Sequence, residues 1–195
     1  MLGNCIENVR KNVPLVHNIT NYVTVNDVAN ILLACGGSPI MSAEPEDVED
    51  ITSICGGLNI NIGTLTKSSI EGMFRAGRKA NELNHPILLD PVGAGASALR
   101  TNTAVQLMEQ LKLTVIRGNI SEIKTLALGS GTTKGVDADV IMVTSANDAK
   151  TVNDAVRLGA VDYLVKPFAE GEIDALTDEL LTRVPQPEKF KIGRA

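Results

Sequence analysis

The stretch "PLVHNITNYVTVNDVANILLACGGSPIMS" (14–42) decides the fold class, because it contains the pattern of a strand, a helix and a second strand in direct succession. Residues 14–19 and 38–42 are short apolar runs. Between them, residues 23–37 show a helical pattern that ends at two glycines, a frequent helix terminator. Two strands joined by a helix favour parallel pairing through a right-handed crossover. The stretch therefore predicts an α/β fold.

The same alternation continues along the chain. Further strands are predicted at 58–63, 86–90, 113–118, 140–145 and 162–167, and further helices at 44–57, 67–84, 102–112, 119–129, 148–160 and 170–184. Most strand candidates are continuously apolar, as expected for strands covered on both faces. We expect residues 1–195 to form one domain, a three-layer α/β/α sandwich with a mostly parallel central sheet, followed by a loose tail at 185–195.

Composition narrows the classes of function. A net charge of −5 without a basic run argues against nucleic acid or an anionic membrane as partner, and no apolar run reaches the ~20 residues of a membrane helix. The sequence has an odd number of cysteines, Cys5, Cys35 and Cys55, and no CxxC motif, which indicates a reduced, cytoplasmic protein. With only His17 and His85, a histidine-rich metal site is not expected.

Three stretches carry a resemblance to a known family. They are residues 14–48, "LDPVGAGAS" (89–97) and "IRGNISEI" (116–123). Together they make residues 1 to about 139 resemble the N-terminal part of the hydroxyethylthiazole kinase family, which is ribokinase-like and acts in thiamine biosynthesis. The resemblance implies an ATP-dependent, magnesium-dependent phosphotransferase whose thiazole pocket lies between the subunits of a trimer.

The resemblance also implies roles for individual residues. It places Asp90 and Glu122 near magnesium and the nucleotide phosphates, and Arg117 in contact with ATP. These residue types suit the chemistry, because magnesium takes one or two carboxylates plus phosphate oxygens and arginine binds phosphate through paired N–H groups. Four further residues would lie near the thiazole, namely Asn21, Val23, Met41 and Gly63.

Structural explanations remain open for the same residues. Asp90 precedes a proline and can serve only to cap a turn. Arg117 and Glu122 can form a surface ion pair of small energetic value. Met41 fits core packing. The glycine-containing run "GAGASA" (93–98) lacks the acidic residue that a dinucleotide-binding fingerprint requires at the end of the next strand, so NAD is not expected.

The C-terminal part carries a second resemblance. "DVIMVTSANDAKTVNDAVRLGAVDYLVKPF" (139–168) resembles the last two βα units of a response-regulator receiver domain. That resemblance makes Thr144 a switch residue, Tyr163 the associated aromatic residue and Lys166 the lysine that contacts a phosphorylated aspartate. The acidic residues that this lysine would need are missing after the first strand, so packing residues and a solvated strand end are the alternative interpretation.

Together the two resemblances give one main interpretation and two alternatives. The main interpretation is an engineered, flavodoxin-like and ribokinase-like chimera of residues 1–139 and 140–184, without efficient catalysis and without a required cofactor. No catalytic residue is assigned, because the glycine-rich anion hole and hydroxyl-activating residue of the family are not found in the sequence. The first alternative is a kinase that phosphorylates 4-methyl-5-(2-hydroxyethyl)thiazole with ATP and magnesium. The second is a receiver-like module that binds a partner.

Two expectations about binding accompany these interpretations. The inherited trimer surface, or apolar surface exposed at residues 140–184, implies a homo-oligomer. Arg117 and the backbone amides of the "DPVGAG" turn (90–95) imply weak binding of phosphate or sulfate.

Overall fold

The computed structural model describes residues 2–129, 140–144 and 160–165. The helix expected at 170–184, the tail at 185–195 and Lys166 lie outside the described residues, as does all of the helix expected at 148–160 except Ala160. The sequence-based expectations for those segments remain predictions.

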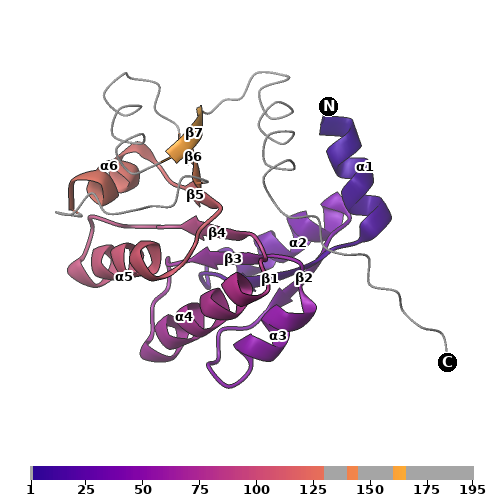
Figure 1. Ribbon diagram of the computed structural model, residues 1–195, viewed down its shortest axis with the longest axis horizontal. Coiled ribbons are helices and arrows are strands. Elements are labelled where there is room, and N and C mark those ends of the chain that lie inside the picture. Colours follow the sequence, from indigo (N-terminus) through magenta and orange to yellow (C-terminus); the bar gives the residue numbers. More distant parts are fainter. Residues whose placement is uncertain (1, 130–139, 145–159, 166–195) are drawn as a thin grey trace.

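The described strands form one parallel sheet. They are β1 (Leu15–Ile19), β2 (Ser38–Met41), β3 (Leu58–Asn61), β4 (Ile87–Asp90), β5 (Val115–Arg117), β6 (Val140–Thr144) and β7 (Ala160–Val165). Their order is β2-β1-β3-β4-β5-β6-β7, and every neighbouring pair is parallel (Figure 1). The predicted α/β fold with a mostly parallel sheet is confirmed, and the last two predicted strands join the same sheet as β5.

Helices flank this sheet. They are α1 (Leu2–Asn12), α2 (Val25–Cys35), α3 (Val48–Ile54), α4 (Lys67–Glu82), α5 (Ala98–Gln110) and α6 (Ile120–Gly129). Figure 1 shows α1 and α2 on one side of strands β1 to β4, and α3, α4 and α5 on the other. None of the helices that the structure describes is both long and apolar enough to cross a membrane.

Helix α1 was not predicted from the sequence. Its apolar residues Leu2, Ile6 and Val9 have helical spacing, but Gly3 and the asparagines around them lower the helix propensity of the segment. By contrast, α4 begins with a clear sequence signal. Thr66 and Ser69 exchange side-chain and backbone hydrogen bonds in a capping box.

The two faces of the central strands differ in burial. Ile60, Leu89 and Ile116 are fully buried in the core that includes residues of α3, α4 and α5. On the opposite face, Leu88 and Val115 are only half-buried. Apolar residues of these three strands are therefore fully buried on one face of the sheet only, and the expectation of burial on both faces is wrong at Leu88 and Val115.

The strand order creates a switch point between β1 and β3. The chain moves from β1 to β2 in one direction and then returns past β1 to place β3 on its other side. The helices that follow β1 and β3, α2 and α4, lie on opposite faces of the sheet (Figure 1), which is the arrangement that forms a crevice outside the carboxyl ends of such strands. In open parallel sheets this crevice is the usual ligand site.

Candidate functional site

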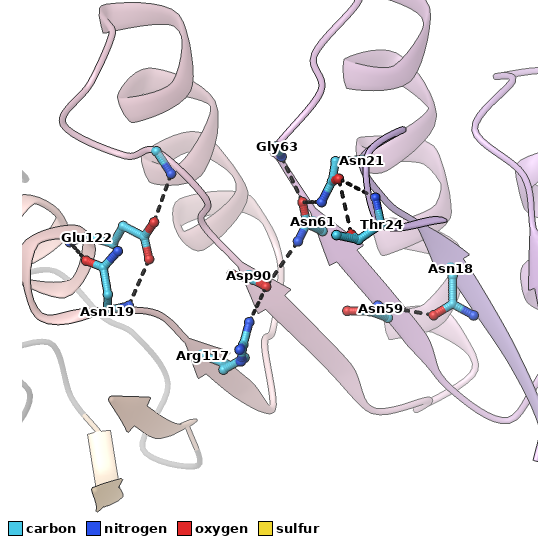
Figure 2. Close-up of polar contacts among 11 residues, drawn as sticks. Asn18, Asn21, Thr24, Asn59, Asn61, Gly63, Asp90, Arg117, Asn119 and Glu122 are labelled. Atoms are coloured by element: carbon cyan, nitrogen blue, oxygen red, sulfur yellow. Dashed lines mark hydrogen bonds and ion pairs between the residues drawn. The ribbon is translucent and has the colours of Figure 1, made fainter. Parts of the chain in front are cut away.

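Four polar side chains form a hydrogen-bonded row at the carboxyl edge of the sheet. We call Asn21, Asn61, Asp90 and Arg117 the polar ladder (Figure 2). Asn21 Nδ2 donates to Asn61 Oδ1 at 3.1 Å, and Asn61 Nδ2 donates to Asp90 Oδ2 at 3.0 Å. Arg117 Nη1 donates to the same Asp90 oxygen at 2.6 Å. Strand register explains the row, since Asn61 lies directly opposite Asp90.

Asp90 is the buried charge of this ladder. Burial raises the pKa of its carboxyl group, and the charge and hydrogen bond of Arg117 offset that shift only in part. The Asp90 side chain is 10% exposed, whereas the Arg117 side chain is 47% exposed. Arg117 therefore holds Asp90 in place while much of its guanidinium group remains open to solvent.

Glu122 does not pair with Arg117, as the alternative of a surface ion pair predicted, but accepts hydrogen bonds from two backbone amides. Its Oε1 accepts from Gly93 N at 2.9 Å, and its Oε2 accepts from Asn119 N at 2.8 Å. Arg117 pairs with Asp90 instead, so the proposed Arg117–Glu122 surface ion pair is wrong. The reason is that β5 ends beside β4, whereas Glu122 lies in the first turn of α6. Glu122 thereby connects the turn after β4 to the start of α6.

The glycine turn after β4 uses its own backbone donors. Gly93 and Gly95 have φ values of +76° and +93°, a region that favours glycine. The amide N–H of each residue from Val92 to Ala96 already donates to a partner in the protein. These five amides are therefore engaged within the protein, and the anion binding expected at this turn stays a prediction.

Arg100 is a residue of this edge that sequence reasoning missed. Its guanidinium group donates to the carbonyl of Val92 at 3.0 Å and to that of Gly63 at 2.9 Å. It therefore ties the loop after β3 to the turn after β4. One signal was available, because an arginine in the first turn of α5 opposes the helix dipole and needs a compensating role.

Two of the four residues expected near the thiazole meet at the switch point. A side chain at Gly63 would approach the Asn21 Cβ and the Asn61 Oδ1 to 2.8 Å, so this close approach requires glycine. Val23 follows Asn21 in the turn after β1 and is 88% exposed. Met41 ends the edge strand β2 and is half-buried, which differs from the fully buried position that core packing predicts.

Two of the three residues with receiver-like spacing lie on β6 and β7. Thr144 is the final residue of β6, and Tyr163 lies in β7 opposite Met142. Lys166 is outside the described residues. The switch interpretation of these three positions is not tested.

A cavity of about 720 Å³ adjoins the ladder. At the carboxyl edge its lining includes Asn61, Asp90 and Arg117, and along the sheet it includes Leu88 and Val115. These five residues lie on the face of β3, β4 and β5 that is opposite the apolar core. The ladder therefore combines buried hydrogen bonds with access from one side.

Comparison with known proteins gives consistent matches. The profile of the hydroxyethylthiazole kinase family matches residues 6–184. A hydroxyethylthiazole kinase of Clostridium acetobutylicum is 60% identical over 171 residues, 88% of this chain and 58% of its own length. One from Clostridium beijerinckii is 56% identical over 153 residues, 78% of this chain and 53% of its own length. The structure of the hydroxyethylthiazole kinase protein from Pyrococcus horikoshii OT3 matches with a TM-score of 0.64 and 42% identity, over 66% of this chain and 50% of that one.

These matches overturn the main functional interpretation. An alignment of 171 residues does not fit within residues 1–139, and the family profile continues to residue 184. The interpretation of the chain as a chimera without efficient catalysis is therefore wrong, and the kinase alternative agrees better with the matches. The receiver resemblance of residues 140–184 is not confirmed, since the kinase family profile extends over those residues.

The matched relatives are much longer than this chain. The chain spans 58% and 53% of the two clostridial kinases. Family membership, however, rests on a profile match over residues 6–184 of a chain of 195 residues. The chain belongs to the hydroxyethylthiazole kinase family.

Proposed function

We propose that this chain transfers the γ-phosphoryl group of ATP to the hydroxyl group of 4-methyl-5-(2-hydroxyethyl)thiazole, a step of thiamine biosynthesis. The observation that carries the proposal is the joining of Asp90, Arg117 and Asn61 at the carboxyl edge of the sheet, beside the switch point. Phosphoryl transfer depends mainly on positioning and on compensation of phosphate charge. The named activity of the clostridial relatives supports the same reaction.

The oxygen donors of the site fit magnesium. Both hydrogen bonds described for the Asp90 carboxylate end on Oδ2, so Oδ1 is the oxygen that accepts from no donor among the described residues. The charge of a second carboxylate, Glu122, acts on Asp90, because it adds to the rise in the pKa of Asp90 that burial causes first. No cluster of three or more metal-binding side chains occurs within the described residues, and magnesium on ATP needs only one or two. When bound, magnesium would neutralise phosphate charge.

Arg117 has the geometry of a phosphate contact. Only Nη1 is engaged by Asp90, and the side chain is 47% exposed. Its remaining N–H groups suit the oxygens of a nucleotide phosphate, which arginine binds in paired geometry. Asp90 orients the guanidinium group for that contact.

The surface formed by the turn after β1 and by α2, where the thiazole is expected, is suited to contact a second copy of this chain. The turn after β1 exposes Tyr22 by 74% and Val23 by 88%, and it lies next to the edge strand that ends at Met41. The following helix α2 carries Ile31 and other apolar residues, yet none of its residues is buried. In the family that the sequence resembles, the thiazole pocket lies between subunits of a trimer, and such a pocket would cover this surface.

The association test uses sedimentation of the wild type and of Val23→Asp. We expect the wild type to sediment as a homo-oligomer and the variant to shift toward the monomer, because a buried carboxylate without a partner destabilises an interface. A monomeric wild type at micromolar concentration would contradict the association.

We also infer a cytoplasmic location, which agrees with free thiols at Cys35 and Cys55.

The catalytic test measures ADP formation together with the mass of the phosphorylated thiazole. We expect ADP formation to depend on both magnesium and the thiazole alcohol, and to fall by about 10²-fold or more in Asp90→Asn. Arg75→Gln is the matched control, since Arg75 pairs with Glu49 at 2.7 Å away from the ladder. ADP formation that does not respond to the alcohol would reject the proposed substrate.

A further inference from the structure

Asn61 occupies the centre of the polar ladder. It ends β3 and is 7% exposed. Its Oδ1 accepts from Gly63 N at 2.8 Å as well as from Asn21, and its Nδ2 donates to Asp90. A backbone N–H can only donate, so the contact with Gly63 fixes which end of the amide is oxygen. The amide group of Asn61 is therefore held in one orientation with its donor directed at Asp90.

Asn21 is held in the same way on the other side. Its Oδ1 accepts from Val23 N at 3.1 Å, from Thr24 N at 3.0 Å and from Thr24 Oγ1 at 3.1 Å. Two of these donors are backbone groups, so the oxygen of Asn21 must face the turn and its Nδ2 must face Asn61. The turn after β1 is thus connected through two amides, each fixed in orientation, to the carboxylate of Asp90 (Figure 2).

We propose that Asn61 is a positioning residue that makes the turn at Asn21 and the carboxylate of Asp90 a single mechanical unit. The proposal rests on the function proposed above and assigns a role to a residue that the sequence did not point to. Asn21 and Asp90 share no hydrogen bond of their own, so Asn61 is the link between them. A change on the thiazole side of the site is then transmitted to the phosphate side through this one amide.

Asn59 supplies a matched control. It lies two residues earlier in β3, where side chains share the same face of the sheet. Its Nδ2 donates to Asn18 Oδ1 at 3.1 Å, and no member of the ladder is its partner. Substitution of either asparagine by alanine removes the same atoms from the same strand, but only one of them breaks the ladder.

The first experiment measures coupling without any substrate. Unfolding free energies are determined for Asn21→Ala, Asp90→Ala and the double variant, in three backgrounds: wild type, Asn61→Ala and Asn59→Ala. We expect the two changes to be non-additive in the wild type and in Asn59→Ala, and additive in Asn61→Ala. Additive behaviour in the wild type, or coupling that persists in Asn61→Ala, would overturn the proposal.

The second experiment separates the two halves of the link by kinetics. Asn61→Asp keeps an oxygen for Asn21 and Gly63 but replaces the donor to Asp90 with a second acceptor. We expect kcat to fall by about tenfold or more while KM for the thiazole alcohol changes less than twofold, and we expect both constants to stay within twofold of wild type in Asn59→Ala. A purely structural asparagine would lower stability and leave kcat of the folded protein unchanged, which would refute the positioning role.

The two experiments fail in distinguishable ways. If the wild type does not phosphorylate the thiazole alcohol but the coupling depends on Asn61, the proposed substrate is wrong and the mechanical link stands. If the wild type is active and the coupling is absent, the kinase proposal stands and the role of Asn61 is wrong.

Discussion

Adjacent residues at the ends of β3, β4 and β5 have opposite roles. Ile60, Leu89 and Ile116 are fully buried in the apolar core, while the residue after each of them joins the polar ladder. Because side chains alternate between the faces of a strand, a shift of one position separates packing from chemistry. The core face is held by apolar burial, and the ladder face by hydrogen bonds around a charge whose burial is unfavourable. We therefore expect substitutions on the core face to lower mainly the unfolding free energy, and substitutions on the ladder face to lower mainly the activity.

The largest expected effect is on the core face. Leu89→Ala should lower the unfolding free energy by about 2–5 kcal/mol, because it leaves a cavity in a fully buried site. Asp90→Asn, one residue later, should change it by less than about 1 kcal/mol. Burial raises the pKa of Asp90 in the folded protein, so its ionised form is less favourable there than in the unfolded chain, and asparagine still offers an oxygen to Arg117.

Urea unfolding of both variants at neutral pH measures this difference. If Asp90→Asn is as destabilising as Leu89→Ala, the ladder contributes to folding as much as the core does, and the contrast between the faces is broken.

The next effect concerns the close approach at Gly63. Gly63→Ala should destabilise the protein by about 1–3 kcal/mol and raise KM for the thiazole alcohol, because its Cβ would meet both Asn21 and Asn61 at 2.8 Å. Gly57→Ala is the control, since its nearest contact there is with Pro86 at 3.6 Å. Thermal unfolding and steady-state kinetics of the pair measure the effect, and equal behaviour of the two variants would contradict the crowding at the ladder.

A smaller, pH-dependent effect concerns His17, a polar residue on the core face. Its ring is fully buried, with Nε2 3.0 Å from the Ser42 carbonyl and Nδ1 2.9 Å from the Thr52 hydroxyl. The carbonyl can only accept, so Nε2 carries the proton and Nδ1 accepts in the neutral ring. Burial lowers the pKa of His17 below the ordinary value of 6.5.

The direction of the pH dependence is set by linkage between proton binding and folding. Below pH 6.5 the unfolded chain binds a proton that the folded His17 does not, so the unfolding free energy should fall as the pH falls from 6.5 toward the lowered pKa. The slope contributed by one such group is at most about 1.4 kcal/mol per pH unit. Urea unfolding between pH 7.5 and 5, with His17→Gln as comparison, measures it, and an unchanged slope in the variant would reject this origin.

The smallest expected effect is anion binding at the ladder. Because the turn amides after β4 are already engaged, we expect a phosphate or sulfate site at the ladder to depend on Arg117. At an anion concentration equal to its Kd, the stabilisation is about 0.4 kcal/mol. A sulfate titration followed by thermal midpoint should show a larger rise for wild type than for Arg117→Gln, and Arg75→Gln should behave as wild type after the general effect of sulfate is subtracted. Equal rises in all three proteins would reject a site at Arg117.

The sequence by itself determined the α/β class and the seven strands that the structure describes, because short apolar runs between helical patterns are a local signal. It also pointed to Asp90, Arg117 and Glu122, through a resemblance carried by contiguous motifs. It missed α1, whose weak helix formers give little local signal, and it assigned residues 140–184 to another family. The kinase family profile, which extends over residues 6–184, does not confirm that assignment.

Only the tertiary structure decided which of these side chains meet. Arg117 pairs with Asp90 because β5 lies beside β4, and Asn61 reaches the same carboxylate because β3 lies on the other side. Arg100 donates to the carbonyl of Gly63, 37 residues away along the chain. Register and strand order are long-range properties, set by packing of the whole sheet, and a linear pattern of residue types does not contain them.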